Sequence, residues 1–231
     1  MPPGGNADYD RAMKPVFPTF MALLIAAASV SGQNSPAPMD AKASPAESKT
    51  LTSEERTRAI DYLKETQKDF LAATDGLSDA QWKFKAGPDR WSIAETAEHI
   101  AVTEGMIWGL VTNKIMKSPP APEKRAEVKG KEEMIMKAIP DRSRKAQAPE
   151  PLRPTGRWAT RAELAKEFEA TRGQELAYIK DTQENLRDHF EEHPAVKTLD
   201  AYQWLLFNGA HCKRHTAQIL EVKADPNFPK K

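Results

Sequence analysis

The 231-residue chain contains one cysteine, Cys212. A single cysteine excludes an intrachain disulfide and a zinc site built from several thiolates, so the folded state must be stabilised by a hydrophobic core. Charge of one sign is not in excess either, because Lys and Arg number 34, Asp and Glu number 33, and the net charge is +1. This balance lacks the basic surplus typical of proteins that bind nucleic acid or anionic membranes, so we expect no nucleic-acid partner.

The sequence also lacks an apolar run long enough to span a bilayer comfortably. The longest run, residues 20–30, has eleven mostly apolar residues followed by small ones, which is typical of the core of a signal peptide. We predict a signal peptide over residues 1–32, with translation starting at Met13, and a disordered Pro/Ser/Ala/Lys-rich linker over residues 33–50. The protein is then expected to be periplasmic or secreted, without stable membrane association after the signal is removed.

No segment alternates polar and apolar residues over the length of a strand, so no sheet is predicted. Capping-box patterns instead mark the starts of three helices, at Thr52 to Glu55, Ser92 to Glu95 and Thr160 to Glu163. The first helix is predicted to end near residue 74. The third is predicted to continue, with a break allowed, until just before Pro194, and a fourth helix runs from about residue 199 to 225.

Four helices of this length predict an all-α, up-down four-helix bundle over residues 51–231. The segment 118–154 is rich in Pro and Lys and is predicted to be a long surface connection with one short helix near residues 132–138.

Three histidines are the candidate metal ligands. His211 and His215 are four residues apart on the last helix, so their rings are about 40° apart around the axis and roughly 6 Å apart along it. His99 lies on the inner face of the second helix, and in a bundle the two faces can meet. Three neutral imidazoles leave a coordination position open, as catalytic metal sites do. The predicted cofactor is one divalent ion, and the ligand set suits Zn, Ni, Fe or Cu.

Four further residues are predicted to lie around these ligands. Glu95, Asn208 and Gln218 are candidates for orienting an imidazole, although Glu95 is also the capping-box acid, and Trp204 is a candidate wall of a pocket. Glu104 lies off the histidine face and is expected at the surface.

Two other candidates are weaker. His189 and His193 are also four residues apart, but Pro194 disrupts helical geometry there and the glutamate of the His-Glu-x-x-His motif is missing, so a solvated helix end beside acidic neighbours is the better interpretation. Cys212 points about 100° away from His211 and is expected to be a small core residue rather than a nucleophile.

These residues carry a family resemblance. Trp91-Ser92-Ile93 leading to His99-Ile100, followed by residues 201–205 and then His211-Cys-Lys-Arg-His215-Thr-Ala-Gln218-Ile219, resembles the DinB-like superfamily of four-helix-bundle proteins over roughly residues 51–229. The resemblance implies a divalent-metal site formed by the three histidines. Members of this superfamily include S-transferases that use bacillithiol or mycothiol and isomerases of the maleylpyruvate type, and the resemblance implies no DNA polymerase activity.

The predicted function is that of a metal-dependent hydrolase acting on a small molecule that the sequence does not identify. An export signal weakens the alternative of a thiol-dependent S-transferase, because cytosolic thiols are scarce in an oxidising compartment, whereas hydrolysis at a metal needs no cosubstrate. A non-catalytic helical module for binding or homodimerisation is the other alternative.

Overall fold

The computed structural model describes residues 50–143 and 147–230. The predicted signal peptide and the predicted linker up to residue 49 lie outside the described residues. Within the described ranges, no helix is both long enough and apolar enough to cross a membrane.

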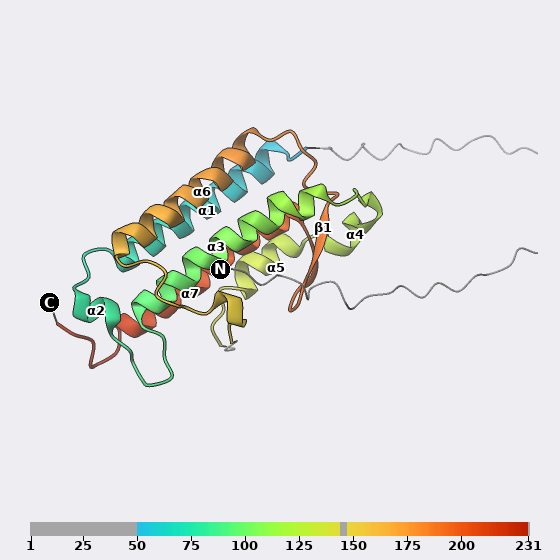
Figure 1. The fold of residues 1–231 in the computed structure, drawn as a ribbon. Coiled ribbons are helices and arrows are strands. Elements are labelled where there is room, and N and C mark those ends of the chain that lie inside the picture. Colours follow the sequence, from blue (N-terminus) through green and yellow to red (C-terminus); the bar gives the residue numbers. More distant parts are fainter. Residues whose placement is uncertain (1–49, 144–146, 231) are drawn as a thin grey trace, which may run out of the picture. The chain divides into compact units, whose positions relative to one another are not determined.

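Four long helices form the expected bundle (Figure 1). They are α1 (Ser53–Thr74), α3 (Ile93–Asn113), α6 (Arg161–Asp181) and α7 (Ala201–Lys223). Each begins with a complete capping box: the cap side chain accepts a hydrogen bond from the backbone amide three residues later, and the side chain of that later residue accepts one from the cap's own amide. The caps are Thr52, Ser92, Thr160 and Asp200. The predicted starts of the first three helices and of the last helix are therefore confirmed.

The helices of the bundle do not alternate strictly in direction. At the start of α7, the Tyr202 hydroxyl donates to the carbonyl oxygen of Glu55 near the start of α1, and at its end Lys223 Nζ donates to Ala73 O near the end of α1. These two helices are therefore parallel. On α3 and α6, Glu104 contacts Arg172 and the later Trp108 contacts the later Gln174, so these two helices are also parallel. The segment between them therefore has to return along the length of the bundle.

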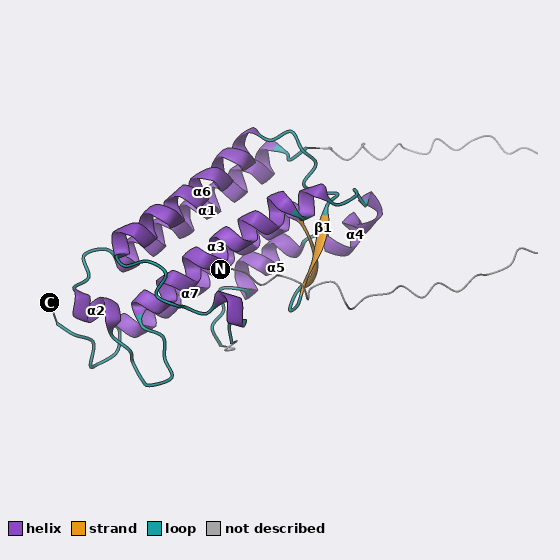
Figure 2. Cartoon of the chain, viewed as in Figure 1, coloured by secondary structure: helices purple, strands orange, loops and turns teal. Residues whose placement is uncertain are grey.

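That returning segment contains several short elements (Figure 2). It includes the 3₁₀ turns η1 (Ile115–Lys117), η2 (Pro122–Lys124) and η3 (Glu150–Leu152), and the helices α4 (Arg125–Val128) and α5 (Lys131–Ala138); a further short helix, α2 (Asp79–Lys83), precedes α3. The predicted helix near 132–138 is confirmed. The expected surface location is only partly correct, because α5 packs on α7 and Val128 and Ile135 are buried.

The prediction of no sheet is wrong. β1 (Phe190–His193) and β2 (Lys197–Asp200) form an antiparallel hairpin, and α6 ends at Asp181 instead of continuing toward Pro194. Each strand has only four residues, and on β1 none is fully buried, so the alternation that identifies a half-buried strand is absent from the sequence.

A buried group of charges joins three helices at mid-bundle. The Arg172 guanidinium on α6 pairs with both carboxylate oxygens of Glu104 on α3, lies 3.3 Å from Glu175, and donates to Thr66 Oγ1 on α1. The expectation that Glu104 is a surface residue is wrong, since it is 1% exposed. α3 packs against both α6 and α7, which widens its buried face beyond one stripe.

Glu175, the second carboxylic acid of this buried group, favours its neutral form. Burial, assisted by the nearby charge of Glu104, raises the pKa of Glu175 well above its usual range. A protonated Glu175 leaves one guanidinium facing one carboxylate, which balances the buried charge.

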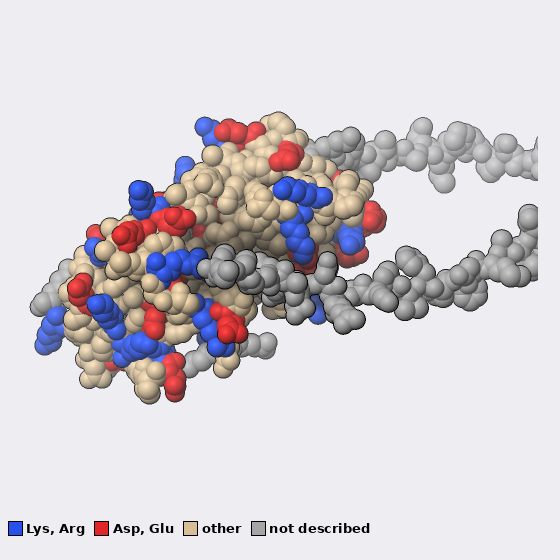
Figure 3. Space-filling view, in the orientation of Figure 1, with Lys and Arg blue, Asp and Glu red and all other residues tan. Residues whose placement is uncertain are grey.

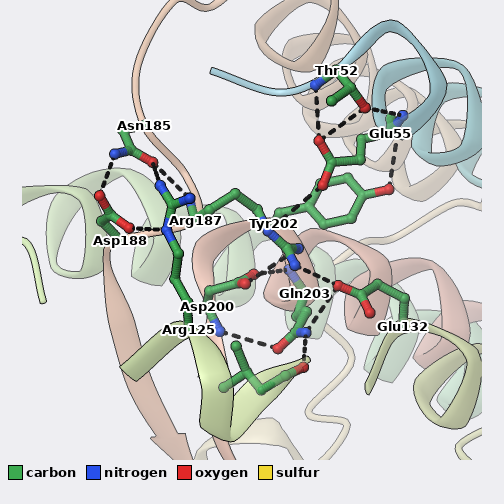
Figure 4. A network of polar contacts seen from close by, with 11 residues as sticks. Thr52, Glu55, Arg125, Glu132, Asn185, Arg187, Asp188, Asp200, Tyr202 and Gln203 are labelled. Carbon is green, nitrogen blue, oxygen red and sulfur yellow. Dashed lines mark hydrogen bonds and ion pairs between the residues drawn. The ribbon is translucent and has the colours of Figure 1, made fainter. Parts of the chain in front are cut away.

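A second polar network lies around the start of α7 (Figure 4). Asp200 accepts from the Gln203 amide as the helix cap, and Arg187 lies 3.2 Å from Asp200 and 2.7 Å from Glu132. Burial raises the pKa of Asp200 to about 7, outweighing the opposite effect of Arg187. On the outer surface, the described part of the face in Figure 3 shows basic and acidic side chains interspersed.

We expect the Arg172→Gln substitution to lower the free energy of unfolding by about 3–5 kcal/mol, because it leaves a buried carboxylate without its partner. Arg58→Gln is the matched control, since Arg58 pairs with Glu54 at the surface and should matter by about 0.5 kcal/mol or less. Urea unfolding followed by circular dichroism measures both. Equal effects of the two substitutions would contradict this account of the core.

Asp200 should make stability depend on pH. Its pKa rises from about 3.9 in the unfolded chain to about 7 in the folded one. The folded state thus binds this proton more tightly, and the contribution of Asp200 to stability falls as the pH rises from 4 through 7. Asp200→Asn retains a capping side chain but cannot titrate.

The free energy of unfolding of the Asp200→Asn variant, relative to the original chain, should therefore increase between pH 5 and pH 8. Urea unfolding at a series of pH values measures this difference, and a difference that does not change with pH would refute the assignment.

Candidate metal centre

The structure brings the three predicted histidines together. His99 comes from α3, and His211 and His215 come from successive turns of the antiparallel helix α7. The Nε2 atoms of His99 and His211 are 3.1 Å apart, and one nitrogen from each of the three rings lies within 4.8 Å of the others. His99 is buried, and His211 and His215 are half-buried, so the group lies at the edge of the bundle's interior rather than deep in its core.

The outer nitrogens of two of these rings have hydrogen-bond partners that fix the rings. Nδ1 of His99 is 2.8 Å from the backbone oxygen of Leu152, and Nδ1 of His215 is 2.9 Å from Oε1 of Gln218. Because both partners are acceptors, each Nδ1 carries the proton and each Nε2 presents a lone pair. This is the arrangement that metal-binding histidines use.

The surroundings keep the three rings neutral. Burial lowers the pKa of His99, and the hydrogen bond to Leu152 only partly opposes this shift. Burial and the charges of the other two rings bring the pKa of His211 well below its usual range, and burial together with the charge of His99 lowers that of His215 to about 3. A metal ligand must be deprotonated, so these shifts favour metal binding over protonation.

The donor set fits a divalent ion. Nitrogen ligands about 2.0–2.1 Å from a tetrahedral ion are about 3.4 Å from each other. The Nε2 atoms of His99 and His211 are 3.1 Å apart, close to this value, and all three ligand atoms lie within 4.8 Å of one another. Among the described residues, no Asp, Glu or Cys joins the group. Three histidines therefore could hold the ion and leave at least one position for another ligand.

The segment just before α6 holds His99 in place, which the sequence did not indicate. Glu98, next to His99, accepts hydrogen bonds from Thr155 N, Thr155 Oγ1 and Gly156 N at 2.7–3.1 Å. This carboxylate ties the connection to α3 and thereby holds Leu152 beside His99. The positive φ of Gly156, 78°, suits glycine at this turn, but nothing local in the sequence links it to a residue 58 positions earlier.

Gln218 is also held in place by a residue of the segment between α3 and α6. Nη1 of Arg142 donates to Gln218 Oε1 at 3.1 Å, while Arg142 Nε and Nη2 pair with the carboxylate of Glu221 at 2.6 and 2.9 Å. Gln218 therefore lies between an arginine and His215, and its position on the ligand face of α7 is as predicted.

The other residues predicted around the ligands have different partners. Glu95 is engaged with the Ser92 amide and Lys85, as its capping role suggested. The orienting role expected for Asn208 is wrong: its Nδ2 donates to Glu175 Oε1 at 2.5 Å and to Glu104 O at 3.3 Å, in the buried polar group. Asn208 faces this group because α7 is buried on several sides along its first half.

Trp204 lies about two turns before His211 and is 4% exposed. Its indole Nε1 donates to Glu191 O at 3.3 Å, so it attaches the hairpin to α7. Cys212 is buried, as predicted, and burial raises the pKa of its thiol to about 12, which disfavours the thiolate that a nucleophile or ligand needs. The interpretation of His189 and His193 as a solvated helix end is wrong, because α6 ends at Asp181 and His193 is the last residue of β1.

These observations define a four-helix-bundle protein with three converging histidines that could hold a metal ion. A family model described as the DinB superfamily matches residues 62–219, and the chain belongs to this superfamily. The Bacillus subtilis (strain 168) protein YuaE, described as uncharacterized, is 30% identical over 148 residues, which are 64% of this chain and 86% of YuaE.

A solved structure is also similar. YfiT from Bacillus subtilis, described as "a probable metal-dependent hydrolase with an unusual four-helix bundle topology", aligns over 80% of this chain and 94% of YfiT. The TM-score is 0.47 and the sequence identity is 17%.

Metal affinity should depend on the partner of His215 as well as on the ligands. We expect Gln218→Ala to weaken zinc binding about 10–100-fold, and His211→Ala to abolish stoichiometric binding. Gln183→Ala, at an exposed glutamine, is the control. Competition with a chromophoric chelator measures the affinities, and unchanged affinity in Gln218→Ala would show that Gln218 does not support His215.

Proposed function

We propose that this protein is a metal-dependent hydrolase of a small molecule, with one divalent ion bound by His99, His211 and His215. One observation carries the proposal: three imidazoles converge, and among the described residues no fourth protein ligand accompanies them. Structural metal sites fill their coordination with protein ligands, whereas catalytic sites keep a position for water or substrate.

A divalent ion supplies Lewis acidity, which polarises a carbonyl or phosphoryl oxygen and lowers the pKa of water. The protein's part is to keep the three imidazoles neutral, correctly turned and close together. Leu152 and Gln218 set two of the rings through Nδ1, and burial suppresses protonation of all three.

The charges around the histidines support the assignment. All three ligands are neutral, so they would leave the full charge of a divalent ion in place, whereas the nearby Arg142 is already paired with the carboxylate of Glu221. A site with this excess of positive charge favours hydroxide and anionic substrates over cationic ones.

The export signal proposed for residues 1–32 bears on the alternatives. In an oxidising compartment, a thiol-dependent transferase would lack its cosubstrate. A non-catalytic module that binds other helices remains the competing function, and it would also contain the metal.

Activity assays separate these functions. The full-length chain, loaded with zinc, nickel or iron, is tested on ester, amide and phosphoester substrates and on thiol conjugation. We expect hydrolysis of at least one class, loss of that activity on chelation, recovery on addition of metal, and a decrease of at least about 100-fold in His211→Ala. His189→Ala, outside the histidine group, should retain the activity.

Two outcomes would overturn the proposal. Conjugation of thiols without hydrolysis would identify a transferase, and absence of turnover by metal-loaded protein on every substrate would favour the non-catalytic module.

A further inference from the structure

A fourth imidazole lies beside the ligand face of α7. His193 is the last residue of β1, and its ring centroid is 4.4 Å from that of Phe207 and 5.3 Å from that of Trp204. The hydrogen bond from Trp204 to Glu191 O attaches the same strand to α7. His193 is therefore held against the helix that carries two of the three candidate ligands.

The tautomer of His193 is set by its own hairpin. Its Nδ1 is 3.0 Å from the backbone amide of Ala195 and 3.2 Å from that of Val196, and both amides donate to it. A nitrogen that accepts two N–H groups cannot carry the proton, so in the neutral ring the proton is on Nε2. Burial lowers the pKa of His193, which favours this neutral form.

The Nε2–H group has no partner among the described residues. In residues 50–143 and 147–230, no hydrogen bond from His193 Nε2 is formed, and the side chain is half-buried, so solvent or a ligand can reach it. The part of the chain that the structure describes thus presents a donor of fixed tautomer and offers it no acceptor.

The ring of Phe207 links this donor to the candidate metal centre. Phe207 lies one turn before His211 on α7, and their rings stack with centroids 6.3 Å apart. His193 packs on the same Phe207 ring, and its charge is one of those that act on His211. His193 does not belong to the group of three rings that could hold the ion.

We propose that His193 is a substrate-binding residue, whose Nε2–H donates a hydrogen bond to an oxygen of an oxyanion bound at the three-histidine centre. This inference rests on the proposed function. The oxyanion follows from the chemistry: a neutral imidazole with its proton on Nε2 offers a donor there, and a divalent ion held by three neutral imidazoles would keep its full positive charge. The group recognised is a carboxylate or a phosphate.

Two substitutions separate the donor from the structural role of the ring. In His193→Asn, the amide oxygen lies near the position of Nδ1 and can still accept from the hairpin amides, but the donor at Nε2 is lost. In His193→Gln, the longer side chain places an amide NH₂ near the position of Nε2 and loses the acceptor at Nδ1. His189→Asn, in the same strand region, is the matched control.

The assay uses full-length protein loaded with cobalt(II), whose visible spectrum changes when an anion joins the metal. Inorganic phosphate and acetate are the two probes. We expect all variants to bind one cobalt ion, and His193→Asn to bind the better of the two anions about 10-fold or more weakly, since hydrogen bonds to charged groups are strong. His193→Gln should lie between His193→Asn and the original chain, and His189→Asn should match the original.

Each outcome decides a separate point. If the original chain does not bind cobalt, the proposed function fails. If it binds cobalt but neither anion changes the spectrum, or if His193→Asn binds the anions as well as the original does, the inference about His193 is overturned and the metal centre stands. Loss of cobalt from both His193 variants with the fold retained would also overturn it, because His193 would then support the metal rather than the anion.

Discussion

The antiparallel packing of α3 against α7 is the interaction on which the rest of the structure depends. It brings His99 to His211 across 112 residues of sequence, and it also places Glu104 beside Asn208. Charged and polar contacts reinforce this packing, from the Arg172 group at mid-bundle to the histidines, which lie about one to two turns away along α3 and α7. The metal centre is therefore one part of a polar seam along an otherwise apolar interface.

This seam imposes opposite electrostatic demands over a short distance. At mid-bundle, buried charges are tolerated because the Arg172 guanidinium pairs with the Glu104 carboxylate, and Glu175 favours its neutral form. At the histidines, no carboxylate of the described residues joins the group, and burial keeps the rings uncharged. A buried opposite charge would stabilise protonated imidazoles, so its exclusion from the group is consistent with a site that binds a cation and then an anion.

The sequence predicted what local patterns determine. Capping boxes located the helix starts, and a spacing of four residues placed His211 and His215 on one face, with His99 as the third ring. It did not predict the hairpin, the parallel α3 and α6, the burial of Glu104 or the actual partners of Asn208. These features arise from contacts between segments distant in the chain. The support for His99 from Leu152 is a backbone contact, which no residue type identifies.

The central claim is that three imidazoles, and no thiolate, bind one divalent ion. X-ray absorption at the zinc edge of the zinc-loaded full-length protein tests it most directly. The account predicts nitrogen ligands at about 2.0–2.1 Å, with the multiple-scattering pattern of three imidazole rings and no sulfur. A sulfur ligand at about 2.3 Å, or a pattern that contains fewer than three imidazoles, would contradict it.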